Sequence, residues 1–345
     1  MMRDMRFGTF VPQGWRFDLV DIPPEEQWPT MLRLARRADE NPDWESIWVY
    51  DHFHTTPMPS EEATHEAWSL MAAFAAATDR VRLGQMCTCM SYRNPAYLAK
   101  VAATIDVISG GRLEMGIGGG WYEHEWRAYG YGFPPTGERL GRLRDGVEIF
   151  RQMWTKGIAT HNGKYYTVDG AIGQPRPLQG TTKPGSDANG IPMWVAGGGE
   201  KVTLRIVAEY GDYANLDPKP EVFAHKSDVL ESHCKDVGRD FGSIVRSANY
   251  NVVIGETEND VQDRLAWIED SYRKAGLSDA AVRQQAQLFR AGPAVGTPEQ
   301  IVEALKGLEK AGMTYCITNF RELAYDTSGI ELFEQTVIPE LRGNP

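Results

Sequence analysis

The sequence lacks the features of membrane and secreted proteins. No segment approaches the run of about 18 consecutive apolar residues that a membrane-spanning helix needs. The N-terminal stretch MMRDMRFGTFVPQGW has no apolar core followed by small residues, so it does not look like a secretory signal. We therefore expect a cytoplasmic protein with no membrane partner.

Cysteine is scarce, and its spacing does not suit a metal site. The four cysteines are Cys87, Cys89, Cys234 and Cys316. Protein metal sites usually contain CxxC pairs or mixed clusters of cysteine and histidine, and the sequence has neither pattern. We expect buried, reduced thiols and no bound metal.

Positive charge is also in short supply. The chain has 36 lysines and arginines against 47 aspartates and glutamates, which gives a net charge of −11 at pH 7. An acidic surface repels the phosphates of nucleic acids, so we expect no nucleic-acid partner. Local basic groups can still hold an anionic cofactor, because binding depends on the local potential and not on the total charge.

What the sequence does contain is a regular alternation of strand-like and helix-like segments. Short apolar runs bounded by glycine alternate with stretches of helical spacing, which is typical of a parallel sheet covered by helices. The predicted strands are Met5–Pro12, Glu45–Tyr50, Val81–Met90, Arg112–Ile117, Ile191–Ala196, Asp212–Leu216, Ser247–Ile254 and Met313–Asn319. The predicted helices are Gln27–Asp39, Trp68–Thr78, Pro95–Ser109, Glu138–Lys156, a helix from about Glu200, and Pro298–Ala311.

This alternation predicts an α/β protein in which residues 1–345 form one (β/α)8 TIM barrel. The alternative, an open doubly wound sheet, would place G-x-G-x-x-G directly after the first strand, where the sequence has PQGW at 12–15. An insertion at about 157–190, after the fourth strand, interrupts the pattern. It begins as a β-hairpin over Gly157–Gly170 and continues as a long loop over Ala171–Gly190.

Chemistry in a (β/α)8 barrel lies at the carboxyl ends of the strands. Two glycine runs, Gly118–Gly120 and Gly197–Gly199, follow predicted strands, and core packing hardly explains them. Ligand binding would explain them, because glycine lets the backbone approach a ligand closely. Gly197–Gly199 opens onto a predicted helix, so either a phosphate binds at the helix N-terminus or the run only makes a tight turn. The candidates at strand ends are Asp51, His52, His54, Cys87, Thr88, Cys89, Arg93, Asn94, Gly118, Gly119, Gly120, Trp121, Tyr122, Gly197, Gly198 and Gly199.

Histidines and aromatic residues leave alternatives open. His52 follows a strand, where it is either a catalytic group or a hydrogen-bonded structural side chain, and Asp51 could orient its ring. His124 lies in the charged stretch Glu123–Glu125, which we interpret as a solvated helix face. The aromatic cluster between Trp121 and Phe133 forms either a small core beneath a loop or a wall for a flat or apolar substrate.

At these positions the sequence resembles the luciferase-like superfamily, specifically its branch of oxidoreductases that depend on the deazaflavin F420. The resemblance covers about residues 5–216 in order, and the C-terminal third matches only in outline, through VGTPEQIVEAL at 295–305. It implies a luciferase-like barrel with an insertion that forms part of the cofactor site. The matching stretches are WVYDHF (48–53), MCTCMSYRNPAYLAK (86–100), TIDVISGGRLEMGIGGGWYEHEWRAYGYGFP (104–134) and PMWVAGGGEKVTLRIVAEYGDYAN (192–215).

The resemblance also implies roles for single residues. His52 matches the family histidine beside the reactive carbon of the deazaflavin. Cys87 and Thr88 fall where members have a strand bulge, often with a non-prolyl cis peptide, that backs the ring. Gly197–Gly199 matches the phosphate loop. The implied cofactor-binding residues are Asp51, His52, Cys87, Thr88, Asn94, Gly118, Gly119, Gly120, Tyr122, Gly197, Gly198 and Gly199.

One position departs from the family pattern. Members that oxidise sugar phosphates have a glutamate directly after the glycines of the fourth strand, where this chain has Trp121. Sugar-phosphate oxidation is therefore not implied. We predict that His52 handles the proton and that Trp121 shapes the catalytic pocket, in a homodimer that moves a hydride between F420 and a small or medium organic substrate.

Two other functions are compatible with the same residues. An FMN-dependent monooxygenase would use the same barrel with a different cofactor. A protein that binds flavin or F420 without turnover is a further alternative, because the fourth-strand acid is missing. Alcohols, ketones, imines and nitroaromatic compounds are all open as substrates.

Overall fold

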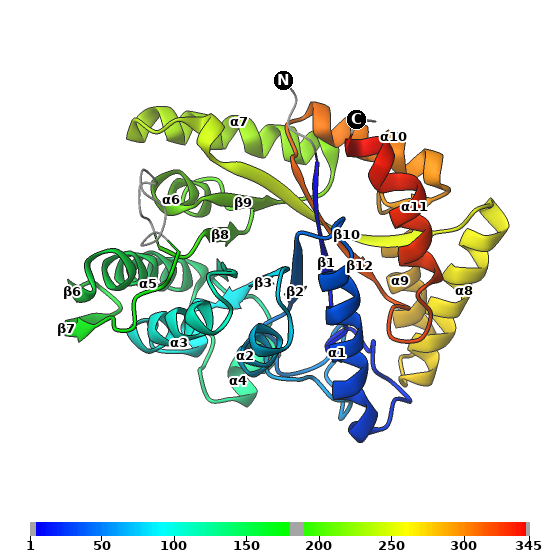
Figure 1. The fold of residues 1–345 in the computed structure, drawn as a ribbon, viewed down its shortest axis with the longest axis horizontal. Helices are drawn as coiled ribbons and strands as arrows, with labels where there is room; N and C mark the ends of the chain where they lie inside the picture. Colours follow the sequence, from blue (N-terminus) through cyan, green and yellow to red (C-terminus); the bar gives the residue numbers. More distant parts are fainter. Residues whose placement is uncertain (1–4, 180–189, 343–345) are drawn as a thin grey trace. The chain divides into compact units, whose positions relative to one another are not determined.

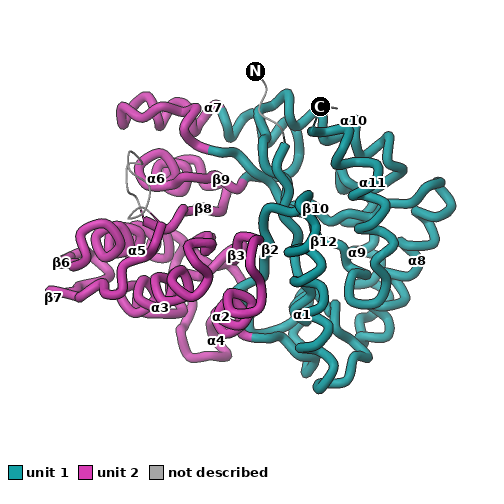
Figure 2. Tube along the Cα trace, viewed as in Figure 1, with its two compact units in different colours: residues 1–65, 216–227, 245–345 teal, residues 66–215, 228–244 magenta. Residues whose placement is uncertain are grey.

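The computed structural model describes residues 5–179 and 190–342, and its backbone divides into two compact units. Figure 2 shows unit 1 (residues 1–65, 216–227 and 245–345) in teal and unit 2 (residues 66–215 and 228–244) in magenta. Each unit contains parallel strands that alternate along the chain with helices (Figure 1). The single domain over residues 1–345 stays a prediction.

The sheet of unit 1 is centred on β1 (Arg6–Phe10). This strand pairs in parallel with β12 (Tyr315–Phe320) on one side and with β2 (Ser46–Val49) on the other. β12 also pairs in parallel with β10 (Val245–Ile254). The short strand β11 (Val295–Gly296) pairs in parallel with the end of β10. Every residue of β2 and β12 is buried, as expected for parallel strands that are covered on both faces.

The helices of unit 1 pack on this sheet through faces of apolar residues. In Figure 1, α8 and α11 lie outside the strands of their unit. The buried residues of α8 recur every three or four positions, and Thr257 and Asp260 form a capping box at its start. The helices are α1 (Pro24–Glu40), α8 (Glu258–Lys274), α9 (Asp279–Arg290), α10 (Pro298–Lys310) and α11 (Ser328–Arg342).

The sheet of unit 2 is centred on β5 (Leu113–Gly118). On one side β5 pairs in parallel with β3 (Arg82–Gln85) and then with the two-residue strand β4 (Thr88–Cys89). On the other side it pairs with β8 (Met193–Ala196), which pairs with β9 (Tyr213–Leu216). The prediction of one continuous strand over Val81–Met90 is therefore wrong, because the chain leaves the ladder between β3 and β4.

The remaining elements of unit 2 include the predicted insertion. Its hairpin is confirmed, since β6 (Ile158–Asn162) and β7 (Thr167–Ile172) pair antiparallel. The predicted loop Ala171–Gly190 falls partly outside the described residues. The helices are α2 (Ala67–Ala77), α3 (Pro95–Ile108), α4 (Glu123–Ala128), α5 (Thr136–Lys156) and α6 (Thr203–Tyr210), and α7 (Pro220–Val237) belongs to both units.

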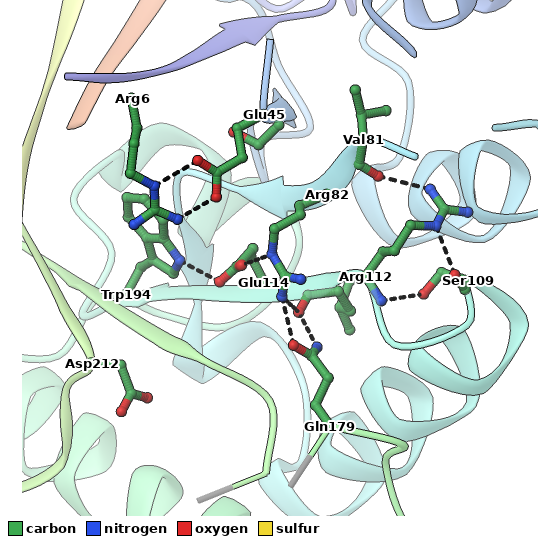
Figure 3. Close-up of polar contacts among 12 residues, drawn as sticks. Arg6, Glu45, Val81, Arg82, Ser109, Arg112, Glu114, Gln179, Trp194 and Asp212 are labelled. Carbon is green, nitrogen blue, oxygen red and sulfur yellow. Dashed lines mark hydrogen bonds and ion pairs between the residues drawn. The ribbon is translucent and has the colours of Figure 1, made fainter. Parts of the chain in front are cut away.

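A hydrogen-bonded network joins the amino-terminal ends of the unit 2 strands (Figure 3). Glu114 is only 2% exposed, pairs with Arg82 and accepts a hydrogen bond from Trp194 Nε1 at 2.6 Å. Arg82 Nη2 also donates to Gln179 Oε1 at 2.5 Å, and the Gln179 amide donates to the carbonyl oxygen of Leu113 at 2.6 Å. The buried carboxylate is thus fully partnered, which is what a structural ion pair requires.

Two observations concern residues 5–179 and 190–342 as a whole. No helix among them is long and apolar enough to cross a membrane. No group of three or more histidine, cysteine, aspartate or glutamate side chains among them is placed to hold a metal ion.

Candidate functional site

His52 lies at the carboxyl end of β2 in unit 1, and its imidazole ring contacts an indole. The rings of His52 and Trp15 stack in parallel, with centroids 4.2 Å apart and an interplanar angle of 2°. Asp51, the preceding residue, is buried, and His52 is half-buried. The sequence did not single out Trp15, because it reaches His52 from the loop after a different strand.

The carboxyl end of the third predicted strand turns sharply in unit 2. The peptide bond between Met86 and Cys87 is cis, as the resemblance predicted for this position. Thr88 is buried, and its hydroxyl donates to the side-chain oxygen of Gln85. Cys87 is half-buried, and its thiol forms no disulfide bond.

The glycines of β5 have a packing role that the sequence did not reveal. A Cβ on Gly116 would lie 1.6 Å from the carbonyl oxygen of Gln85, and a Cβ on Gly118 would lie 2.7 Å from Cys87 Sγ. A Cβ on Gly120 would lie 2.6 Å from Cys89 Sγ. The absence of a side chain at these alternate positions therefore lets the turned segment between β3 and β4 approach β5. The expectation that core packing hardly explains the run Gly118–Gly120 is wrong.

The second glycine run leads into α6, but not directly. The helix begins at Thr203, three residues later than predicted, because residues 200–202 form a turn. Gly197 has a φ of +124°, which side chains rarely tolerate, and a Cβ on Gly199 would lie 2.8 Å from Thr203 Oγ1. Gly197, Gly198 and Gly199 are exposed, so their backbone is open to a ligand.

The aromatic cluster after β5 divides into two parts. Trp126 is fully buried and packs against Tyr92 and Phe133, which is the small core that one interpretation predicted. Trp121 is 59% exposed and stacks on Tyr122 with centroids 5.3 Å apart, which suits the alternative of an aromatic wall. Burial and the nearby Glu125 raise the pKa of Tyr122 to about 12, so its hydroxyl stays protonated at neutral pH.

Several polar residues near these strand ends have structural partners within the chain. Asn94 caps α3 by accepting hydrogen bonds from the backbone N–H groups of Ala96 and Tyr97. Arg93 pairs with Glu66 at 2.7 Å. The interpretation of 123–125 as a solvated face is wrong for Glu125, which is buried and accepts a hydrogen bond from Tyr92 Oη at 3.0 Å.

Several buried N–H groups at these strand ends have no hydrogen-bond partner within the described chain. They are Gln85 Nε2, Trp126 Nε1 and Arg139 Nε, all in unit 2. Arg139 also donates through Nη1 to the carbonyl oxygen of Gly120 at 2.6 Å, which holds the loop after β5. Buried donors without a partner are rare in proteins, and they fit a bound ligand that carries acceptor oxygens.

Comparison with known proteins identifies the family. The model of the luciferase-like monooxygenases matches residues 5–315. The chain belongs to the luciferase-like monooxygenase family. This membership makes it a luciferase-like oxidoreductase.

Luciferase-like relatives of two kinds are similar to this chain. An F420-dependent glucose-6-phosphate dehydrogenase from Amycolatopsis mediterranei is 32% identical over 53% of this chain, and the match spans half of that relative's length. The pyrimidine monooxygenase RutA from Allorhizobium ampelinum is 29% identical, over 77% of this chain and 70% of its own. The family therefore includes relatives whose chemistry differs.

A solved structure establishes the fold. An F420-dependent secondary alcohol dehydrogenase, in complex with an F420-acetone adduct, matches 99% of this chain and 100% of its own with a TM-score of 0.76 and 20% identity. At this identity the likeness shows the fold alone. The fold class is the luciferase-like (β/α)8 barrel that the sequence predicted.

Proposed function

We propose that the protein is an F420-dependent oxidoreductase that transfers a hydride between the deazaflavin and a small or medium organic substrate. The observation that carries the proposal is the set of unpartnered buried donors at the carboxyl ends of β3 and β5. A planar ring with carbonyl oxygens would satisfy such donors. The match of the strand-end residues to the F420-dependent branch supports the deazaflavin over FMN.

Residues at the carboxyl ends of the unit 2 strands would contribute to cofactor binding. Gly197–Gly199 would present exposed backbone to the cofactor phosphate, since glycine has no side chain to prevent close approach. Gln85 Nε2 would donate to a ring oxygen, because the Thr88 hydroxyl already occupies the oxygen of the same amide. Asp51, Cys87, Asn94 and Gly118–Gly120 stay predictions as cofactor contacts.

The chemistry needs few groups from the protein. When bound, F420 supplies a hydride at C5. His52 would hold or release a proton at the substrate oxygen, because an imidazole nitrogen can both accept and donate a proton. Tyr122 would donate a hydrogen bond to the substrate and would not act as a base, since its pKa of about 12 keeps the hydroxyl protonated.

Trp121 supports a flat or apolar substrate. Its indole is 59% exposed beside Tyr122, where the sugar-phosphate dehydrogenases of this branch carry an acid. An exposed aromatic pair favours ketones, imines or nitroaromatic compounds over sugar phosphates. The homodimer and the cytoplasmic location stay predictions.

The test is turnover with each cofactor. Reduced F420 is mixed with the protein and a panel of ketones, imines and nitroaromatic compounds, and its oxidation is followed by absorbance. The expected result is oxidation of F420 that depends on one substrate class. The similarity to a pyrimidine monooxygenase favours FMN as the second candidate, so oxygen-dependent turnover with reduced FMN alone would overturn the proposal.

A further inference from the structure

His52 is the last member of a column of aromatic rings in unit 1. Phe10 stacks on Tyr50 with centroids 4.2 Å apart, Tyr50 contacts Trp15 at 4.1 Å, and Trp15 stacks on His52 at 4.2 Å. Phe10, Tyr50 and Trp15 are each buried, while His52 is only half-buried. The column therefore extends from the core of unit 1 to a ring that a ligand can contact.

The loop that carries Trp15 is held on both sides of the indole. Before it, the Gln13 side chain donates to the carbonyl oxygen of Tyr50 and accepts from the Tyr50 N–H, both at 2.8 Å. After it, the buried carboxylate of Asp18 accepts from the N–H of Gly14 at 2.6 Å. Gly14 has a φ of +95°, and a Cβ there would lie 1.8 Å from the carbonyl oxygen of Ala63. The position of Trp15 is thus set by the backbone of the strand that precedes His52.

The indole acts through its ring faces. Trp15 is 4% exposed, and its Nε1 has no hydrogen-bond partner within the described chain. Since the rings are parallel, the indole covers one face of the imidazole and opposes rotation of the ring out of that plane.

We propose, on the basis of the function proposed above, that Trp15 is the positioning residue of His52. By fixing the plane of the imidazole, it limits the directions in which a ring nitrogen can hold or release a proton at the substrate. Small errors in the placement of such a group lower the rate strongly, because proton transfer requires the reacting atoms to be aligned. Trp15 itself contacts no reacting atom.

The test compares Trp15→Phe with Trp15→Leu in the full-length protein. Phenylalanine keeps an aromatic face, and leucine keeps apolar volume without one. The matched control is Trp267→Leu, in α8 of the same unit, whose indole is 36% exposed. Two readouts are taken: kcat and KM with F420 and substrate, and the ring-proton NMR signals of His52 without cofactor, assigned with His52→Ala.

For Trp15→Leu we expect kcat to fall by about tenfold to a hundredfold while KM and cofactor affinity change by less than about threefold. Trp15→Phe should restore kcat to within about threefold of wild type. The His52 signals should lie upfield in the wild type, move downfield in Trp15→Leu, and be unchanged in Trp267→Leu, because the Trp15 indole stacks on the imidazole and shields it.

The two readouts separate this proposal from the proposed function. Unmoved His52 signals in a folded Trp15→Leu protein, or an unchanged kcat, would overturn the positioning role. If Trp15→Leu does not fold, equal loss of kcat in Trp15→Phe and in a volume-matched Trp15→Met would overturn it as well. Wild-type protein that shows the shielded His52 signals but oxidises no reduced F420 would contradict the proposed function and leave the contact between the two rings intact.

Discussion

The two ends of the unit 2 strands satisfy their buried polar groups differently. At the amino-terminal ends, Glu114 has both Arg82 and Trp194 as partners, and Gln179 completes the network. At the carboxyl ends, the side chains of Gln85, Trp126 and Arg139 each contain a buried N–H group without a partner in the described part of the chain. The buried polar groups of the same short strands are thus all hydrogen-bonded at the amino-terminal ends, while three buried N–H groups lack a partner within the described residues at the carboxyl ends.

This difference indicates which end is arranged for stability and which for a ligand. Unsatisfied buried donors cost about 1–3 kcal/mol each, so a protein retains them mainly where something else will meet them. In (β/α)8 barrels the carboxyl ends of the strands carry the chemistry. The turned segment between β3 and β4, with glycines of β5 opposite, lies at this same end.

The largest expected effect concerns the complete network. Glu114→Ala should lower the free energy of unfolding by about 3–5 kcal/mol, because it leaves the Arg82 guanidinium and the Trp194 N–H without their buried partner. Urea unfolding measures this loss. The control is Glu123→Ala, which removes an exposed ion pair with Arg127 and should cost less than about 1 kcal/mol. Equal losses in both variants would show that the network does not stabilise the strand ends.

The second effect concerns catalysis at the carboxyl end of β2. His52→Ala should reduce turnover with F420 by about a hundredfold or more and leave cofactor affinity within a few-fold, because it removes a positioned proton-handling group. Steady-state kinetics with a matched control, His225→Ala on the exposed face of α7, gives the comparison. Normal turnover of His52→Ala would mean that the proton comes from solvent, Tyr122 or Glu125.

The third effect is a pH dependence at the carboxyl end of β12 in unit 1. Burial raises the pKa of Glu322 to about 7, and its Oε2 has no partner within the described residues. The folded state then keeps a proton that the unfolded state releases, so stability is full below about pH 4.5 and falls as the pH rises to about 7. Glu322→Gln cannot lose this proton. Its unfolding free energy relative to wild type should therefore increase by about 2 kcal/mol between pH 4.5 and 7.5.

Urea unfolding of both proteins at several pH values measures this difference. Subtracting the wild-type curve removes the pH dependence of all other groups. A difference that does not change between pH 4.5 and 7.5 would show that Glu322 titrates in its ordinary range.

The smallest effect concerns Gly197–Gly199, the proposed phosphate loop. Gly197→Val should weaken cofactor binding by about tenfold, because a branched side chain disfavours the φ of +124° and obstructs a close approach to the backbone. Gly238→Val is the matched control, since Gly238 also has a positive φ, of +71°, but follows α7 in open space. Fluorescence titration compares the two. If both bind the cofactor like the wild type, Gly197–Gly199 only forms a turn.

Most of the fold could be predicted from the sequence because parallel strands and their helices leave a local pattern. β5 reads as a continuous buried run, and α10 begins with a capping box in the sequence TPEQ. Helices α7, α8, α9 and α11 were not predicted. In α9 the signal was present, since Ser278 caps the helix and its buried residues Val282, Ala286 and Phe289 follow helical spacing. The break between β3 and β4 has no such pattern, because an apolar run does not reveal where a strand leaves its ladder.

The candidate site was predictable only in part, for a physical reason. His52 and the glycines are recognisable from local motifs, but their partners come from distant segments. The contact of Trp15 with His52, and the contact of Gly118 with Cys87, depend on how strands far apart in the sequence lie together. The sequence also could not show that Gln85 Nε2 lacks a partner within the described chain, because this depends on every hydrogen bond that the folded unit forms around it.

The most direct test of the account is a binding titration of the purified protein with F420 and with FMN, followed by fluorescence quenching. In the proposed function, a deazaflavin completes the hydrogen bonding at the incomplete carboxyl ends of the strands. The proposed function predicts saturable binding of F420 with a Kd in the micromolar range or tighter, weakened in Gln85→Leu because the buried amide donor is lost. Micromolar or tighter binding of FMN with no binding of F420 would contradict it.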